Sequence, residues 1–297
     1  MTTLRSRLGR SETVSGWALV SPAALLIGVF GLLPVLMSLQ LSFQDSDLLS
    51  DKTPWVGFDN YRKLAEDPMF LESVKHTIVY TALFVPGTML VGLLIAAAMN
   101  RSLRFISVYR TAAYVTMAVS TISQGIIFLW LTDRDYGLVN AGLNAVGLPS
   151  QPFLASPSQA LFVIVAMTIW GWTGFSVIVY LAALQGVPAE LHEAAAIDGA
   201  SAATRFRTIT VPLLGPANLF LVVWLTINAL QLFDEVYATT RGGPLRATTV
   251  IVYYLWDRAF VQFDAGYAAA MAYALFVVIL VITGIQFRLA RRHVHYS

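Results

Sequence analysis

Six apolar runs constrain the possible folds of this chain more than any other feature of its sequence. They lie at about 16–39, 73–99, 109–131, 159–184, 213–235 and 264–287. A helix rises about 1.5 Å per residue, so each run is long enough to cross the roughly 30 Å hydrocarbon core of a membrane. Because lipid cannot satisfy backbone polar groups, the runs predict an all-α, polytopic membrane protein with six transmembrane helices.

The composition agrees with a lipid-facing exterior. Of the 297 residues, 57% are hydrophobic and only 12% are charged, whereas soluble domains carry about 25% charged residues. The chain has no cysteine, so it forms neither disulfides nor thiolate metal sites. The first run follows Arg5, Arg7 and Arg10, as in a signal peptide. Its apolar core is too long for one and no small-x-small cleavage site follows, so we expect a retained helix.

The basic residues predict the orientation in the membrane. If both termini lie on one side, that side holds eleven basic and four acidic residues, a balance of +7, against −5 on the other side. Cytoplasmic loops carry the excess of basic residues, so both termini are predicted to be cytoplasmic. The basic residues of that side are Arg5, Arg7, Arg10, Arg101, Arg104, Arg110, Arg205, Arg207, Arg288, Arg291 and Arg292.

The connections between the runs predict a single transmembrane domain over residues 1–297. The external connection at 40–72 mixes acidic residues with Trp55, Phe58 and Tyr61, which indicates a small ordered cap. Residues 132–158 are rich in glycine, proline, asparagine and serine, a composition typical of irregular turns. Neither connection is long enough for a separate soluble domain.

The cytoplasmic segment at 185–216 predicts two short helices joined by a sharp corner. Pro188 suits the first position of a helix, and Glu190 favours its positive end. Gly199 can end this helix in a left-handed conformation. Ser201 can cap a second helix, which Val211-Pro212 is expected to end. From these residues alone, a surface for a partner and an amphipathic hairpin resting on lipid headgroups are both open.

The same segment resembles the signature loop of permease subunits in binding-protein-dependent ABC importers. The matching positions are Glu193, Ala194, Ala195, Asp198, Gly199, Ala200, Phe206, Ile209, Pro212 and Pro216. Val211 departs from the pattern, because relatives usually have leucine there. Phe233-Asp234, followed by Thr240-Arg241-Gly242-Gly243-Pro244 and Ala247-Thr248-Thr249, resembles the external turn between the last two helices of sugar and glycerol-phosphate permeases. The ending Gln286-Phe287-Arg288, with Val294 and Tyr296, most resembles the glycerol-3-phosphate branch.

The resemblance implies a non-catalytic transport subunit of the bacterial inner membrane. It would form half of the path for a small polar solute: glycerol 3-phosphate, a glycerophosphodiester or a sugar. The implied partners are a second similar permease, two ATPase subunits, an extracytoplasmic solute-binding protein and the lipid bilayer, with no nucleic acid. In the family, the loop sits in a cleft on the ATPase. Carried over, Glu193 is the contact residue, Gly199 the corner, Ala194 and Ala195 the close-packing face, and Phe206 and Ile209 the anchors of the second helix.

Polar side chains within the apolar runs are candidates for the solute path. Trp224, Asn228 and Gln231 are spaced i, i+4 and i+7, so they share one helix face. Gln124 and Trp172 are the other two candidates for the solute path. An aromatic ring beside amides suits a sugar or polyol. The alternative is that these side chains join helices, with the tryptophans in interfacial belts.

No catalytic or cofactor site is predicted. The glycines Gly87 and Gly92 are followed by Leu93 and Leu94, so the phosphate-binding pattern G-x-x-x-x-G-K-[S/T] is not met there. ATP hydrolysis is therefore expected on a partner. Ser176 has no histidine at depth in a later run to activate it, which argues against a membrane-embedded hydrolase.

The four histidines predict no metal site. His293 and His295 lie in a basic tail, and His192 lies within the two-helix segment. A self-sufficient secondary transporter remains as an alternative class. It would typically need an internal repeat with broken helices and an intramembrane ion site, and neither is evident in the sequence.

Overall fold

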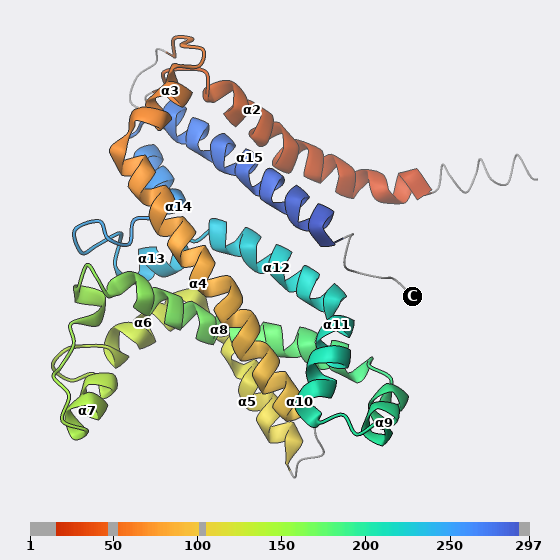
Figure 1. Ribbon diagram of the computed structural model, residues 1–297. Coiled ribbons are helices and arrows are strands. Elements are labelled where there is room, and N and C mark those ends of the chain that lie inside the picture. Colours follow the sequence, from red (N-terminus) through yellow and green to blue (C-terminus); the bar gives the residue numbers. More distant parts are fainter. Residues whose placement is uncertain (1–15, 47–52, 101–104, 291–297) are drawn as a thin grey trace, which may run out of the picture. The chain divides into compact units, whose positions relative to one another are not determined.

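The computed structural model describes residues 16–46, 53–100 and 105–290. The described residues are helical with no strand, apart from an isolated bridge between Gln44 and Trp55 (Figure 1). The expected all-α fold is confirmed. Residues 1–15, 101–104 and 291–297, which hold most of the basic residues of the predicted cytoplasmic side together with His293 and His295, lie outside the described ranges.

Among the described residues, four helices are long and apolar enough to cross a membrane, and the number is six if each of two bent pairs counts as one span. The four are Gly16–Leu41, α4 (Pro68–Met99), α8 (Ala160–Gln185) and α15 (Ala265–Ala290). One bent pair is α5 (Ile106–Ala118) with α6 (Thr121–Leu131), at 101°. The other joins Ala202–Leu213 to α12 (Gly215–Leu230), at 64°.

The third predicted run, 109–131, is wrong as a continuous helix. Val119 is extended, with ψ 123°, and the hydroxyl of Ser120 accepts a 3.3 Å hydrogen bond from the backbone N–H of Ser123. Ser120 thus caps α6 as a separate helix. The side-chain amide of Gln124 closes the break by donating to the Val119 carbonyl at 2.9 Å.

The fifth predicted run, 213–235, also ends earlier than expected. Its helix α12 stops at Leu230, and Asp234 and Glu235 begin a separate short helix, α13 (Asp234–Thr239). These two acids therefore lie beyond the end of α12.

The predicted end of the second short helix at Val211-Pro212 is wrong. The chain continues from α10 (Ala202–Arg205) through the π-helical turn η3 (Phe206–Thr210) into α11 (Val211–Leu213). Proline lacks an N–H and collides with the preceding turn of a regular α-helix. A π-turn widens the turn just before Pro212, which lets the helix pass. The turn η1 (Ile27–Leu32) precedes Pro34 of α2 (Leu33–Leu41) in the same way.

The chain divides into two compact units. In the described part of the first unit, Met1–Leu64 with Arg258–Tyr273, the ring of Phe43 contacts three other aromatic rings at centroid distances of 5.3–5.6 Å. These rings belong to Trp55, Phe58 and Tyr61. The amide of Asn60, in α3 (Asp59–Glu66), donates to the carbonyls of Ser42 and Gln44 at 3.0 and 2.9 Å.

The second unit comprises Ala65–Asp257 and Ala274–Ser297, and its core is built on α4 and α8. These two helices pack together more extensively than any other pair of described elements, and α4 crosses α8 in Figure 1. Tyr80, Phe84 and Tyr180 are almost fully buried between them and their neighbours. The remaining elements are α7 (Leu138–Ala145), η2 (Phe153–Ala155), α9 (Ala189–Ile197), α14 (Ile251–Trp256) and η4 (Asp257–Val261), of which η4 crosses the boundary between the units.

Candidate functional sites

The segment from α9 to α11 forms the corner predicted from the sequence. Helix α9 ends at Ile197, and Gly199 has φ +79°. The hydroxyl of Ser201 accepts a 3.2 Å hydrogen bond from the N–H of Thr204 and so caps α10. The left-handed glycine and the serine cap are both confirmed. Pro188 lies one position earlier than predicted, as the N-cap of α9.

The surface of α9 is open, and four of its nine residues are alanines. None of its residues is buried, and Ile197 at its end is 87% exposed. An ideal Cβ at Gly199 would meet no atom within 4 Å, so this chain leaves the space beside the corner free. The predicted coupling residues divide between exposed Glu193, Ala194, Asp198 and Gly199 and half-buried Ala195, Ala200 and Phe206.

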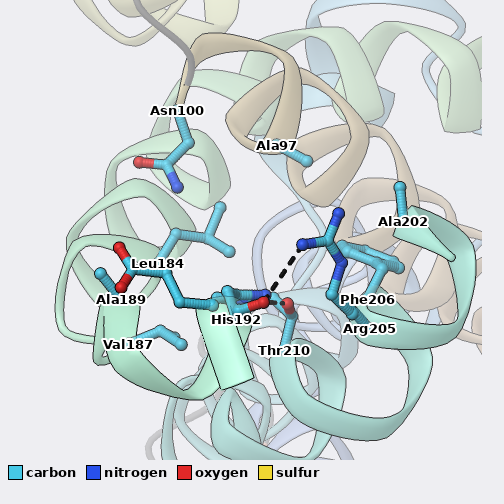
Figure 2. A pocket seen from close by; sticks show the side chains of 11 residues that line it. Ala97, Asn100, Leu184, Val187, Ala189, His192, Ala202, Arg205, Phe206 and Thr210 are labelled. Atoms are coloured by element: carbon cyan, nitrogen blue, oxygen red, sulfur yellow. Dashed lines mark hydrogen bonds between the residues drawn. The ribbon is translucent and has the colours of Figure 1, made fainter. Parts of the chain in front are cut away.

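Hydrogen bonds join α9 to the helix that follows it. The Arg205 guanidinium donates from Nη1 to the His192 carbonyl at 3.1 Å, and Thr210 Oγ1 lies 3.5 Å from His192 Nε2 (Figure 2). These residues line a cavity of about 530 Å³, together with Glu193, Phe206 and the ends of α4 and α8. These contacts hold α9 against the segment that begins with α10.

A second cavity, of about 290 Å³, lies where α12 gives way to α13; we call it the α13 cavity. Its lining brings together three of the five predicted path residues, Trp172, Asn228 and Gln231. The other lining residues are Tyr80, Phe84, Thr121, Leu232, Phe233, Asp234 and Glu235. Five helices, α4, α6, α8, α12 and α13, therefore contribute to it.

Two adjacent carboxyl groups distinguish the lining of the α13 cavity. Asp234 is exposed and Glu235 is half-buried. Burial raises the pKa of the Glu235 carboxyl to about 7; a backbone hydrogen bond opposes this rise and the charge of Asp234 adds to it. The side-chain amide of Asn228 donates to the Trp224 carbonyl at 2.8 Å, which holds that amide against the α12 backbone.

The other two predicted path residues do not line this cavity. The side chain of Gln124 packs α6 onto α8, since a Cβ added at Gly171 would lie 2.2 Å from Gln124 Oε1. Trp224 is 44% exposed; its ring stacks on Phe220 at 6.1 Å and contacts Phe175 at 6.1 Å.

Sequence reasoning missed Tyr80, Phe84 and Thr121, because nothing in one sequence pairs α4 and α6 with the end of α12. Asp234 and Glu235 stand at the end of the apolar run 213–235, and that position by itself predicts that solvent surrounds them. The helix break at Leu230 is what turns them toward a cavity.

The described residues include no group of three histidine, cysteine, aspartate or glutamate side chains that could hold a metal ion. His76 has a structural role: its Nδ1 lies 3.0 Å from the Thr249 carbonyl and its Nε2 lies 3.4 Å from Glu72. The hydroxyl of Ser176 is buried in α8.

The fold and the two-helix segment define a permease of an importer. Residues 88–295 match the family "binding-protein-dependent transport system inner membrane component", and the chain belongs to this family. It is therefore an integral protein of the inner membrane. It is 36% identical to the lactose transport system permease protein LacF of Rhizobium radiobacter, over 98% of each chain.

Two further relatives extend the comparison. The sn-glycerol-3-phosphate transport system permease protein UgpA of Agrobacterium fabrum is 32% identical, over 95% of this chain and 96% of the relative. A chain of the bacterial ABC transporter that imports the acidic polysaccharide alginate superimposes with a TM-score of 0.86 at 25% identity, covering 99% of this chain and all of that one.

Proposed function

We propose that this chain is one permease subunit of an ATP-driven importer for a small polar solute, a sugar, glycerol 3-phosphate or a glycerophosphodiester. It works with a second, similar permease, two ATPase subunits that hydrolyse ATP, and an extracytoplasmic solute-binding protein. The family's dependence on a binding protein supports this assembly, as do the permeases for lactose and glycerol phosphate among the relatives.

The observation that carries the proposal is the open corner at Gly199. Helix α9 has four alanines, the exposed carboxylate of Glu193 and no buried residue, so it gains little packing energy from its own chain. Such a surface suits close approach by a partner, and Glu193 suits a basic residue of that partner. We therefore assign residues 185–216 as the coupling segment that docks on the ATPase.

The charge balance of +7 against −5 supports an orientation with both termini and this segment in the cytoplasm. Residues 1–297 then form one transmembrane domain, with 40–72 as an external cap. The α13 cavity lies at the opposite end of α12 from the coupling segment, and we place it on the solute path.

Glu193→Ala and Gly199→Val test the coupling role. Removing one member of a partly buried ion pair costs about 2–5 kcal/mol. A branched side chain at φ +79° adds about 1–3 kcal/mol of strain and fills the free space beside the corner. Both variants are expected to reach the membrane at normal levels and to lose most of the ATPase that copurifies with the tagged permease.

Gly147→Val is the matched control. Gly147 has φ +80° and also has no atom within 4 Å of an added Cβ, but it follows α7, outside the coupling segment. Gly147→Val and Gly199→Val thus introduce the same backbone strain, but only Gly199→Val lies in the coupling segment. If Gly199→Val retains as much ATPase as Gly147→Val and Glu193→Ala retains as much as the unmodified chain, the segment is not the coupling element.

A further inference from the structure

The lining of the α13 cavity is acidic. Asp234 and Glu235 are neighbours at the start of α13, and both line the cavity. Within the described parts of the chain, no lysine, arginine or histidine joins them there. The other side chains of the lining, among them the polar Tyr80, Thr121, Asn228 and Gln231, are uncharged. We therefore expect a negative electrostatic potential inside this cavity when the carboxyl groups are ionised.

The hydrogen-bonding chemistry of the lining favours a solute that brings donors. An ionised carboxylate only accepts hydrogen bonds, whereas amides donate and accept. A polyhydroxyl solute can donate to Asp234 and Glu235 and accept from the amides. An ionised phosphate brings acceptors alone and adds like-charge repulsion. The rings of Phe84 and Trp172, 6.4 Å apart in an edge-to-face arrangement, add apolar surface for the carbon face of a sugar.

Membership of the family does not decide the charge of the solute. The names of the relatives include lactose, which is neutral, as well as glycerol 3-phosphate and an acidic polysaccharide, which are anionic. Charge selection must then come from residues that differ between members. Asp234 belongs to the turn that resembles sugar and glycerol-phosphate permeases alike, whereas Glu235 beside it in the lining is outside the matching positions and can differ between members.

We propose that Asp234 and Glu235 make the α13 cavity a charge filter, which admits uncharged polyhydroxyl solutes and repels anionic ones. The filter rests on the proposed function, because it acts only if the cavity lies on the solute path. At about 8 Å and an effective dielectric constant of about 20, one unit charge changes the local concentration of another by about 30-fold. In a wetter cavity, with an effective dielectric constant of about 40, the local concentration changes by about sixfold.

The absence of cysteine from this chain permits a direct test. Gln231→Cys places one thiol in the lining, and Ser158→Cys places one on an exposed loop outside it. In the assembled importer, reconstituted with its partners, we would measure how fast this chain is modified by neutral, cationic and anionic methanethiosulfonates. The ratio of cationic to anionic rates at one thiol does not depend on its ionised fraction, so it reports the local potential.

The ratio at Gln231→Cys is expected to exceed that at Ser158→Cys by at least about fivefold. Adding Glu235→Gln or Asp234→Asn should lower it toward the loop value. Asp135→Asn, which removes an exposed carboxylate outside the cavity, should leave it unchanged.

Two failures are distinguishable. If even the neutral reagent does not modify Gln231→Cys, the cavity is closed to solutes and the proposed path fails, and the filter fails with it. If the neutral reagent reacts but the charge ratio equals that of the loop, or does not respond to either carboxylate variant, the path stands and the filter is refuted.

Discussion

The contact between α4 and α8 gives a sharp stability prediction at Gly92. A Cβ added there would lie 2.5 Å from the Cβ of Ser176 and 3.3 Å from its carbonyl carbon. Carbon atoms in contact normally stand about 3.5–4.0 Å apart, so Gly92→Ala must separate the two helices by about 1 Å. Overpacking of this kind typically costs about 1–3 kcal/mol.

Gly284→Ala is the control for this substitution. Gly284 is exposed in α15, and an added Cβ meets no atom within 4 Å. Both changes gain about 1 kcal/mol of helix propensity, so their difference isolates the packing cost. The midpoint of thermal unfolding in detergent, followed by circular dichroism, is expected to be several degrees lower for Gly92→Ala than for Gly284→Ala.

A double-mutant cycle identifies the obstructing atom. Ser176→Gly removes the Cβ at 2.5 Å, so Gly92→Ala should cost much less in that background, with a coupling energy of about 0.5–3 kcal/mol. Equal unfolding midpoints for Gly92→Ala and Gly284→Ala, or additive effects in the cycle, would refute the close packing of α4 on α8.

Three further predictions concern topology, path and pH. A cysteine at Ser156 should react with an impermeant thiol reagent in intact cells, whereas one at Ala203 should react only after permeabilisation; the reverse pattern would invert the orientation. Asn228→Leu should lower uptake of the transported solute while the ATPase still copurifies, and equal loss of both would mean that this residue only joins helices. Because the pKa of Glu235 is raised to about 7, its charge is lost as the pH falls from 8 to 6. The cationic preference in the α13 cavity should fall over this range and stay flat in Glu235→Gln.

The sequence predicts well those features that depend on neighbouring residues. The glycine corner and the Ser201 cap follow from local backbone preferences, and the lengths of the apolar runs follow from the thickness of a bilayer. The continuous helix predicted at 109–131 failed because hydropathy does not register a cap. The sequence is compatible with Ser120 in the middle of one long helix or at the start of a second helix. The hydrogen bond from the Ser123 N–H to the Ser120 hydroxyl decides for the second position.

The spacing of polar residues along one helix does not predict the lining of the α13 cavity. Three residues of one α12 face were predicted as a set, yet Trp224 faces aromatic neighbours while Asn228 and Gln231 line the cavity. The end of α12 at Leu230 changes the direction of the chain there. Which side of a helix meets a cavity depends on the helices packed around it, and a single sequence does not specify their positions.

The continuity of the chain from the corner to the cavity has a mechanical consequence. The segment Ala202–Leu213 leads into α12 with one bend, at Leu214, whose side chain is fully buried. Helix α12 has 16 residues and is therefore about 24 Å long. It can act as a lever with its pivot at Leu214: a tilt of about 5° would carry the far end, near Asn228, through about 2 Å. That displacement is larger than the distance range over which a hydrogen bond to a solute is made or lost.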